Sequence, residues 1–199
     1  PVKIGSSSWS MVSNGALFTA AIDITGALYT WGLNSNGQLG DGTTINKSSP
    51  VKIGSNSWNI VSTNTSVTAA IDSTGALYTW GYNLYGQLGD GTLVSKSSPV
   101  QIGTSSWSMV ASGTLTRALT INNDLFLWGD GSYSGFGDGT TGSKSSPVLI
   151  TAVQPVSYDS WKQISMGASH TVAIRASDSS LYAWGLNSVG QLGDGTTIN

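Results

Sequence analysis

Cysteine and glutamate are absent from this sequence of 199 residues, and charged residues make up only 9% of it. The lack of cysteine excludes disulfides, zinc thiolate sites and cysteine nucleophiles. Only 8 Lys and Arg residues are spread along the chain, and its net charge is −2, so it has no basic patch for nucleic acid or an anionic membrane. No apolar run reaches the length of a membrane span. We therefore expect no nucleic-acid partner and no membrane insertion.

Groups that perform acid–base catalysis are also scarce, because His170 is the only histidine. A catalytic triad would need it beside a nucleophile and an acid such as Asp178, whereas an isolated histidine in a strand favours a packed structural role. We predict that the chain is not an enzyme and binds no cofactor. The abundance of Ser, Thr, Asn and Gly, in place of charges, suggests an extracellular, cell-surface or virion setting.

The sequence is an array of four similar segments. A Pro-Val-x-Ile segment starts at residues 1, 50 and 99, with a fainter copy at 147. Two tryptophan series recur, at Trp9, Trp58, Trp107 and Trp161, and at Trp31, Trp80, Trp128 and Trp184. The first series has spacings of 49, 49 and 54 residues, which indicates an insertion near residues 151–158. We treat residues 1–199 as one array of repeats, approximately 1–49, 50–98, 99–146 and 147–199.

Each repeat contains four short runs of strand-forming residues, and no segment has helical periodicity. In the first repeat these runs are residues 1–4, 9–12, 18–23 and 27–31. The last two runs are joined by a turn from Asp23 to Gly26, where glycine can adopt the positive φ that a tight hairpin needs. Four strands per repeat at this period predict an all-β fold, a β-propeller with four four-stranded blades.

A glycine-rich motif follows the last run of each repeat. Residues 31–43 read Trp-Gly-Leu-Asn-Ser-Asn-Gly-Gln-Leu-Gly-Asp-Gly-Thr, and the motif returns at 80–92 and 184–196, with a degraded copy from Trp128. Residues 167–174 form a second motif, Gly-Ala-Ser-His-Thr-Val-Ala-Ile. The pattern resembles the repeat of the regulator of chromosome condensation family, which implies a propeller.

The resemblance says less about function, because one fold carries many functions. The founding member of the family promotes nucleotide exchange on a small GTPase and binds chromatin, and other members are receptors, ligase subunits or structural proteins. The family usually has seven repeats, whereas this chain has four and has few of the charges that a GTPase or nucleosome contact needs. Exchange activity is therefore the weakest of the functions that we consider.

The Gly-Asp-Gly triplets allow two interpretations, a calcium loop or a tight turn. They contain Asp41, Asp90, Asp138 and Asp194. Calcium takes several carboxylates, and each loop offers one beside neutral Asn and Gln, so we favour turns in which Asp caps backbone amides. No Gly-Lys-Ser/Thr sequence follows the glycines, which argues against a phosphate-binding loop. We predict no metal site.

Aromatic residues are candidates for both packing and binding. The tryptophans recur at equivalent positions, which favours packing between blades over a carbohydrate-stacking surface. Tyr82, Tyr85 and Tyr133 depart from the repeat and lie in expected loops. We interpret these three tyrosines as possible partner contacts.

The two ends of the sequence suggest an exchange of strands. The final motif runs to Asn199 without the Pro-Val-x-Ile strand that follows it elsewhere, and Pro1, Val2, Lys3 and Ile4 form one such strand to spare. An unpaired edge is a template for pairing. Either the four blades close on themselves, or this strand completes the last blade of another chain. We favour the second arrangement, a head-to-tail contact that gives a ring or an open filament.

The resulting hypothesis is a non-enzymatic structural or adhesive propeller that assembles with copies of itself into a ring or an extracellular filament or appendage. The alternative is a propeller that binds a glycan or another surface protein. A role like that of a guanine-nucleotide exchange factor comes last.

Overall fold

The computed structural model of the chain describes residues 1–132, 136, 141–150, 161–166 and 170–198, and the regular elements in these ranges are all β-strands. They are β1 (Trp9–Asn14), β2 (Phe18–Asp23), β3 (Leu28–Gly32), β4 (Lys47–Lys52), β5 (Trp58–Thr63), β6 (Val67–Asp72), β7 (Leu77–Gly81), β8 (Lys96–Gln101), β9 (Trp107–Ala111), β10 (Leu115–Thr120), β11 (Leu125–Gly129), β12 (Lys144–Leu149), β13 (Trp161–Met166), β14 (His170–Arg175) and β15 (Leu181–Gly185).

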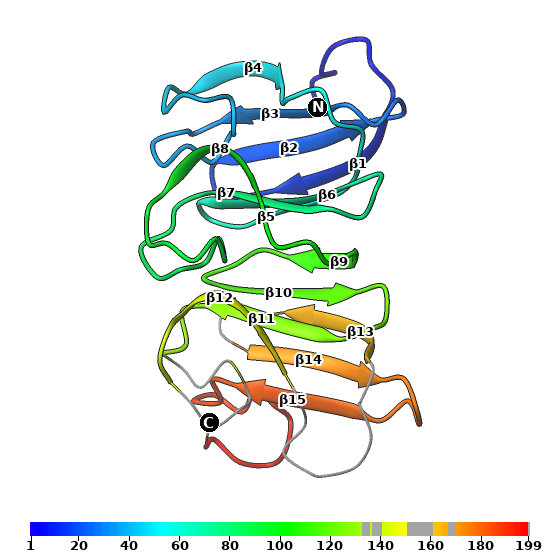
Figure 1. Cartoon of the computed structure of the whole chain (residues 1–199), viewed down its shortest axis with the longest axis vertical. Helices are drawn as coiled ribbons and strands as arrows, with labels where there is room; N and C mark the ends of the chain where they lie inside the picture. The colour runs from blue at the N-terminus through cyan, green and yellow to red at the C-terminus, as the bar shows by residue number, and fades with distance from the viewer. Residues whose placement is uncertain (133–135, 137–140, 151–160, 167–169, 199) are drawn as a thin grey trace.

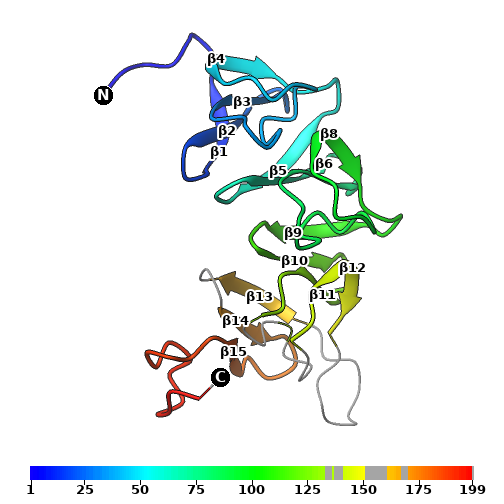
Figure 2. The ribbon, with the colours of Figure 1, turned by 90° about the vertical axis from the view of Figure 1, so that its left-hand side faces the viewer.

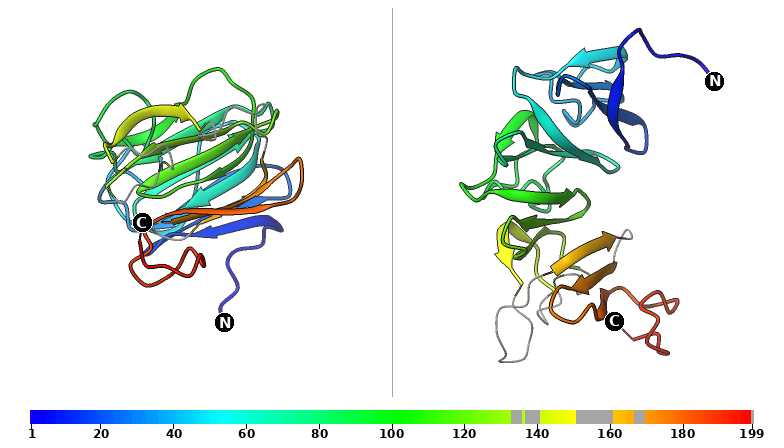
Figure 3. Two further views of the ribbon diagram at one scale, coloured as in Figure 1. Left: turned by 90° about the horizontal axis from the view of Figure 1, so that it is seen from below. Right: turned by 90° about the vertical axis from the view of Figure 1, so that its right-hand side faces the viewer.

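The strands form four antiparallel sheets that stack one below another along the long axis of the molecule (Figure 1). We call them blades 1 to 4. Their strand orders are β1-β2-β3-β4, β5-β6-β7-β8, β9-β10-β11-β12 and, with three strands among the described residues, β13-β14-β15. This arrangement confirms the all-β propeller. The two chain ends lie at opposite ends of the stack, so the blades of one chain do not close on themselves (Figures 1 and 3).

The Pro-Val-x-Ile segment belongs to the blade that precedes it. In blade 1, β4 pairs with β3, with Val51 opposite Thr30 and Lys52 opposite Tyr29. The strand begins at Lys47, before the expected start at Pro50, because a shift in register lets Lys47 pair with Gly32. Each of blades 1 to 3 therefore starts at a tryptophan and ends with the Pro-Val strand. The expected insertion at residues 151–158 lies outside the described residues.

A fixed turn joins the second and third strands of blades 1 and 2. In blade 1, Asp23 Oδ1 accepts hydrogen bonds from the backbone N–H groups of Thr25 at 2.8 Å and Ala27 at 3.0 Å. Gly26 has a φ of +83°, which confirms the predicted need for glycine. The Gly26 carbonyl also accepts the N–H of Trp58 at 2.7 Å. The turn that closes one hairpin thus positions the first strand of the next blade.

The hydrophobic core lies between blades. The cluster between blades 1 and 2 contains Ala20, Ile22, Leu28, Ile53, Trp58, Val61, Ala70 and Trp80. Corresponding clusters join blade 2 to blade 3 and blade 3 to blade 4. Trp80 and Trp128 are fully buried in these layers, which confirms that tryptophans pack between blades. Each blade consequently has two apolar faces, and Figure 2 shows the four blades edge-on in their stack.

Candidate interaction surfaces

The glycine-rich motif folds into a loop that is organised by its asparagine. In blade 1, Asn34 Oδ1 accepts the N–H of Leu39 at 2.9 Å, while Asn34 Nδ2 donates to the Thr43 carbonyl at 3.0 Å. Asn83 makes the same two bonds in blade 2, as does Asn187 in blade 4. The buried amide satisfies backbone groups that the loop would otherwise leave unpaired, which explains why the motif needs asparagine there.

The aspartate of the Gly-Asp-Gly triplet closes this loop. Asp41 Oδ1 accepts the backbone N–H of Thr43 at 3.0 Å, and its Oδ2 lies 3.1 Å from Lys47 Nζ. Asp90 does the same with Thr92 and Lys96. These contacts confirm the turn interpretation for Asp41 and Asp90, whereas Asp138 lies outside the described residues. Among the described residues, no group of three or more His, Cys, Asp or Glu side chains could hold a metal ion.

The glutamine of the motif connects one blade to the next. The backbone carbonyl of Gln38 accepts hydrogen bonds from Trp80 Nε1 at 3.0 Å and from Thr68 Oγ1 at 2.8 Å. The Gln87 carbonyl receives the same pair of bonds from Trp128 and Thr116 in blade 3. We call this arrangement the blade joint. Sequence reasoning placed tryptophan between blades but missed the Gln carbonyl as its acceptor, because the motif gives no sign of a backbone contact.

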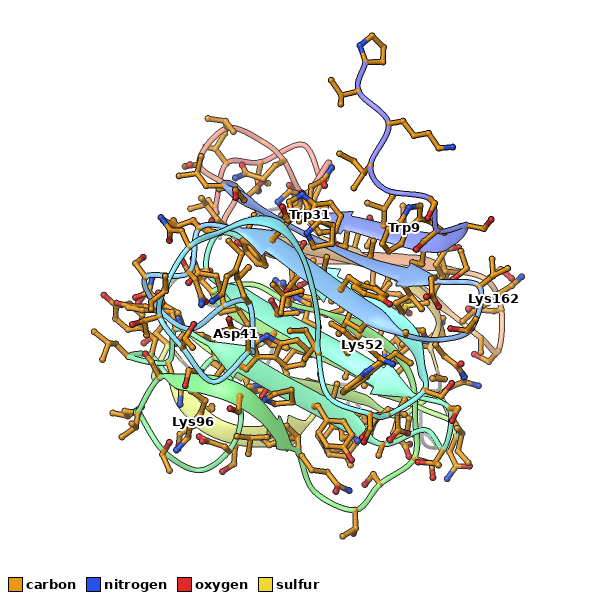
Figure 4. All side chains as sticks on the ribbon, turned by 90° about the horizontal axis from the view of Figure 1, so that it is seen from above. Trp9, Trp31, Asp41, Lys52, Lys96 and Lys162 are labelled. Carbon is orange, nitrogen blue, oxygen red and sulfur yellow. The ribbon has the colours of Figure 1, made fainter. Side chains whose placement is uncertain are left out.

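The outer faces of blades 1 and 4 carry apolar side chains at the positions that are buried between blades, with Val172 of blade 4 in the place of Ala20, but these faces are open. Val61 is 1% exposed at the joint of blades 1 and 2, whereas its counterpart Val12 on blade 1 is 63% exposed. Likewise Leu28 is fully buried, and its counterpart Leu181 on blade 4 is 68% exposed. Figure 4 looks onto the outer face of blade 1, where Trp9 and Trp31 lie side by side. Both outer faces of the described blades are therefore apolar and accessible.

The segment of residues 1–4, which we call the N-terminal segment, lies outside any strand. Its four side chains are exposed, and the chain here extends away from blade 1 (Figures 2 and 4). Ile53, the counterpart of Ile4, is 1% exposed and donates its N–H to the Leu28 carbonyl at 2.8 Å. The outer edge of β15 has no partner among the described strands.

Two of the three singled-out tyrosines come together. The rings of Tyr82 and Tyr85 have centroids 6.4 Å apart at an angle of 58°. They line a pocket of about 220 Å³ with residues of blades 1, 2 and 3, which lie in loops except for Val67 at the start of β6: Asn36, Asn64, Thr65, Ser66, Val67, Gln87, Gly113 and Thr114. No Asp, Lys, Arg or His side chain lines it. Tyr133 lies outside the described residues.

The structure gives His170 and Asp178 separate surroundings. His170 is half-buried at the start of β14, opposite Gly185 on β15. Asp178 is exposed in the turn that follows β14, where it accepts a hydrogen bond from Arg175 Nε at 3.0 Å. The Arg175 guanidinium holds the pKa of the Asp178 carboxyl well below its ordinary value. Asp178 is thus engaged in a local turn, as are Asp23 and Asp41.

The stacked four-stranded sheets, with one core layer between each pair, define a tandem-repeat β-propeller. Models of the regulator of chromosome condensation (RCC1) repeat match residues 25–69, 74–115 and 122–174, and a second model of the same repeat matches residues 161–191. The chain belongs to this family. A search of the curated proteins found no relative.

Solved structures agree with this assignment. Human WBSCR16 is 25% identical, with a TM-score of 0.83 over 100% of this chain and 52% of that one. Yeast RCC1 (Prp20), solved in complex with Kap60, is 17% identical, with a TM-score of 0.82 over 100% of this chain and 48% of that one. Another structure of Prp20p, described with its binding to Gsp1p and histones, is 20% identical, with a TM-score of 0.77 over 98% and 49%. The chain spans about half the length of these relatives.

The relatives correct one expectation. The extracellular, cell-surface or virion setting is wrong, because RCC1-family relatives such as the Kap60- and histone-binding Prp20 are intracellular proteins. A surface rich in hydroxyl and amide groups reports how the protein is solvated and says nothing about its compartment. Among the described residues, no helix has the length and apolarity to cross a membrane.

Proposed function

We propose that the chain is a non-enzymatic structural or adhesive module that binds copies of itself head to tail through its two end blades. The observation that carries the proposal is the contrast in exposure between equivalent side chains. Val12 on blade 1 and Leu181 on blade 4 are exposed, while their counterparts between blades are buried. Fully burying one such side chain contributes roughly 1.5–3 kcal/mol, so covering both faces is favourable.

The proposed partner is a second copy, because the two open faces correspond to the two sides of an internal contact between blades. Blade 1 presents the side chains that blade 2 turns toward blade 1. Blade 4 presents Ile174 and Leu181 where blade 1 turns Ile22 and Leu28 toward blade 2, with Val172 in the place of Ala20. Such a contact is heterologous: it closes into a ring if the rotation allows, and otherwise it continues as a filament. Membership of a family whose solved members bind other proteins is compatible with this role.

The molar mass of the chain in solution tests self-association. Size-exclusion chromatography with multi-angle light scattering should give a molar mass that exceeds the mass of one chain and rises with protein concentration. Leu181→Asp should reduce the chain to a monomer, because it places a charge on the apolar face that the contact would bury. Ile121→Asp is the matched control, since Ile121 has a similar exposure, 63% against 68%, but lies in the turn between β10 and β11. A wild-type chain that stays monomeric at all concentrations would refute the proposal.

A second candidate function rests on the Tyr82–Tyr85 pocket. Its lining of Tyr, Asn, Ser, Thr and Gly resembles the composition of surfaces that bind proteins through rigid aromatic and adaptable polar groups. The volume of about 220 Å³ is below the range of roughly 300–1,000 Å³ for small-molecule sites. We propose that the pocket takes one uncharged side chain from a loop of a partner protein, with a neutral glycan as the alternative ligand.

Display of random peptides and a glycan array distinguish these ligands. Peptides selected on the wild-type chain should share one uncharged apolar residue, and they should lose binding to Tyr85→Ala. They should still bind Leu84→Ala, because Leu84 is exposed on the same loop but does not line the pocket. Glycans that bind the wild type and not Tyr85→Ala would show that the ligand of the pocket is a glycan. Peptides that bind Tyr85→Ala as well as they bind the wild type would show that they do not bind at the pocket.

A further inference from the structure

The joint between blades 1 and 2 and the joint between blades 2 and 3 use equivalent atoms. They therefore serve as a template for the geometry of a joint between two chains. Besides the bonds to the Gln38 and Gln87 carbonyls, each tryptophan ring covers a glycine of the preceding loop. A Cβ built on Gly40 would lie 2.5 Å from Trp80 Nε1, and one on Gly89 would lie 2.6 Å from Trp128 Nε1. The glycine is required because the indole occupies the space of a side chain.

The counterparts of these groups stand at the two ends of the array. Trp31 and Thr19 on blade 1 correspond to Trp80 and Thr68, while Gln191 and Gly193 on blade 4 correspond to Gln38 and Gly40. Gly193 has a φ of +73°, like its counterparts, yet no described atom lies within 4 Å of a Cβ built on it. The loop of blade 4 thus keeps the shape of a joint while the position of the indole is open.

The outer strand pairs within its own blade and then leads directly into the next blade, as β4 leads into β5. The residue that follows this strand donates its N–H to the first residue of the third strand, as Ile53 does to Leu28 and Ile102 to Leu77, both at 2.8 Å. On blade 4 the corresponding acceptor is Leu181, the first residue of β15. The corresponding donor is Ile4 of the N-terminal segment, which is 42% exposed.

Hydroxyl groups near the first strands add a further link between blades. Ser13 Oγ accepts the N–H of Thr63 at 3.0 Å, and Ser62 Oγ accepts that of Ser112 at the same distance. Blade 3 has Ala111 at this position, and the serine returns on blade 4 as Ser165 of β13, which is exposed; the corresponding N–H on blade 1 belongs to Asn14 of β1. The end blades therefore carry this pair as well.

Resting on the proposed head-to-tail assembly, we propose that the joint between two copies reproduces the internal blade joint. Trp31 of one copy covers Gly193 and donates to the Gln191 carbonyl of the other. The N-terminal segment of the first copy pairs with β15 of the second as its fourth strand, with Lys3 opposite Tyr182, as Lys52 is opposite Tyr29. Both interactions are needed for a complete contact. Without the strand pairing, the backbone groups at the edge of β15 stay unpaired, and without the indole, the apolar face of blade 4 stays exposed.

Two alanine variants test the position of Trp31. Gly193→Ala adds a methyl group where the indole would lie, and it should abolish assembly. Gly195→Ala is the matched control: its φ of +82° gives the same backbone strain, but the counterparts Gly42 and Gly91 have only a serine Oγ at 3.7 Å from a built Cβ. Gly195→Ala should assemble as the wild type does. If the two variants associate equally, the proposed joint is wrong, even if the chain still forms oligomers.

Cysteine pairs test the strand, since the chain has no cysteine of its own. Lys3→Cys and Tyr182→Cys, made in separate chains and mixed under mild oxidation, should give a disulfide-linked dimer, because opposed residues in antiparallel strands lie within disulfide range. Lys3→Cys mixed with Ile121→Cys should give at least tenfold less. Equal yields from the two mixtures, in a chain that assembles, would overturn the strand pairing. A chain that never assembles instead refutes the function on which this proposal rests.

Discussion

Replacing Gly40 by alanine should destabilise the chain much more than the same change at Gly193. Both glycines have positive φ, +80° and +73°, and an alanine in that conformation costs about 1–2 kcal/mol. At Gly40 the new Cβ would also lie 2.5 Å from Trp80 Nε1. Trp80 is fully buried and its N–H is bonded to Gln38, so it has no room to yield.

The additional cost at Gly40 follows from overpacking, which typically takes about 1–3 kcal/mol. We therefore expect Gly40→Ala to lose about 2–5 kcal/mol and Gly193→Ala about 1–2 kcal/mol, when both are compared as monomers. Gly89→Ala serves as a repeat of the first measurement, because its Cβ would lie 2.6 Å from Trp128 Nε1. From sequence alone all three positions are expected to be equally sensitive.

The free energies of unfolding come from urea titrations followed by circular dichroism, at concentrations low enough to keep the chain monomeric. Leu181→Asp as a common background removes the contribution of assembly. Equal losses for Gly40→Ala, Gly89→Ala and Gly193→Ala would show that backbone strain alone matters. The close approach of the indole, on which both the internal and the proposed joint depend, would then be disproved.

Three further predictions follow from the same contacts. Trp80→Phe should lose about 2–3 kcal/mol of stability in urea, since it removes a buried hydrogen bond to Gln38 and leaves a cavity in the core, while Trp31→Phe should change the stability of the monomer much less; similar losses for both would contradict the assignment. Asp41→Asn should cost about 1 kcal/mol or less, because it removes a partly exposed ion pair with Lys47, and calcium should not raise the melting temperature of either form. Burial raises the pKa of Asp41 and Asp90, but hydrogen bonds from Thr43 and Thr92 and the neighbouring lysines outweigh it, so each folded pKa lies below the ordinary value of 3.8. This stabilisation is complete above the unfolded pKa and is lost as the pH falls through the folded values, so the urea midpoint should decline below about pH 4 and stay level above about pH 5.

The fold was predictable because the same pattern of strands and turns occurs in four consecutive repeats. Strand-forming runs, a glycine turn after Asp23 and tryptophans at a fixed spacing each point to one four-stranded unit per repeat, and agreement across these signals is what specifies a structure. The sequence allowed two interpretations of the Pro-Val strand: it opens each repeat as we numbered them, whereas the missing copy after Asn199 assigns it to the preceding blade, which is where the structure places it. The boundary of a repeat can be drawn at any point of a periodic sequence. In the structure, the pairing of Val51 with Thr30 places the boundary of blade 1 after the Pro-Val strand.

The candidate sites were predictable only in part. Tyr82 and Tyr85 stood out because they break a nearly identical repeat, but their pocket is formed by loops of three blades, whose relative placement depends on the packing between sheets. The open space at Gly193 was not foreseen either. Its local sequence equals that around Gly40, and the difference lies in the blade that follows. Local sequence determines the loop, and the neighbouring blade determines what touches it.

The layering of the core between blades has a mechanical consequence. Force applied between the two ends of the stack would act on all the blade joints at once, because they are arranged in series, and each joint holds a separate apolar layer. Such a chain should yield one repeat at a time under tension, and each event should release a repeat of 49 residues, or about 170 Å at roughly 3.4 Å per residue. A stretched array would therefore dissipate the applied work in separate unfolding steps, with the remaining blades intact after each step.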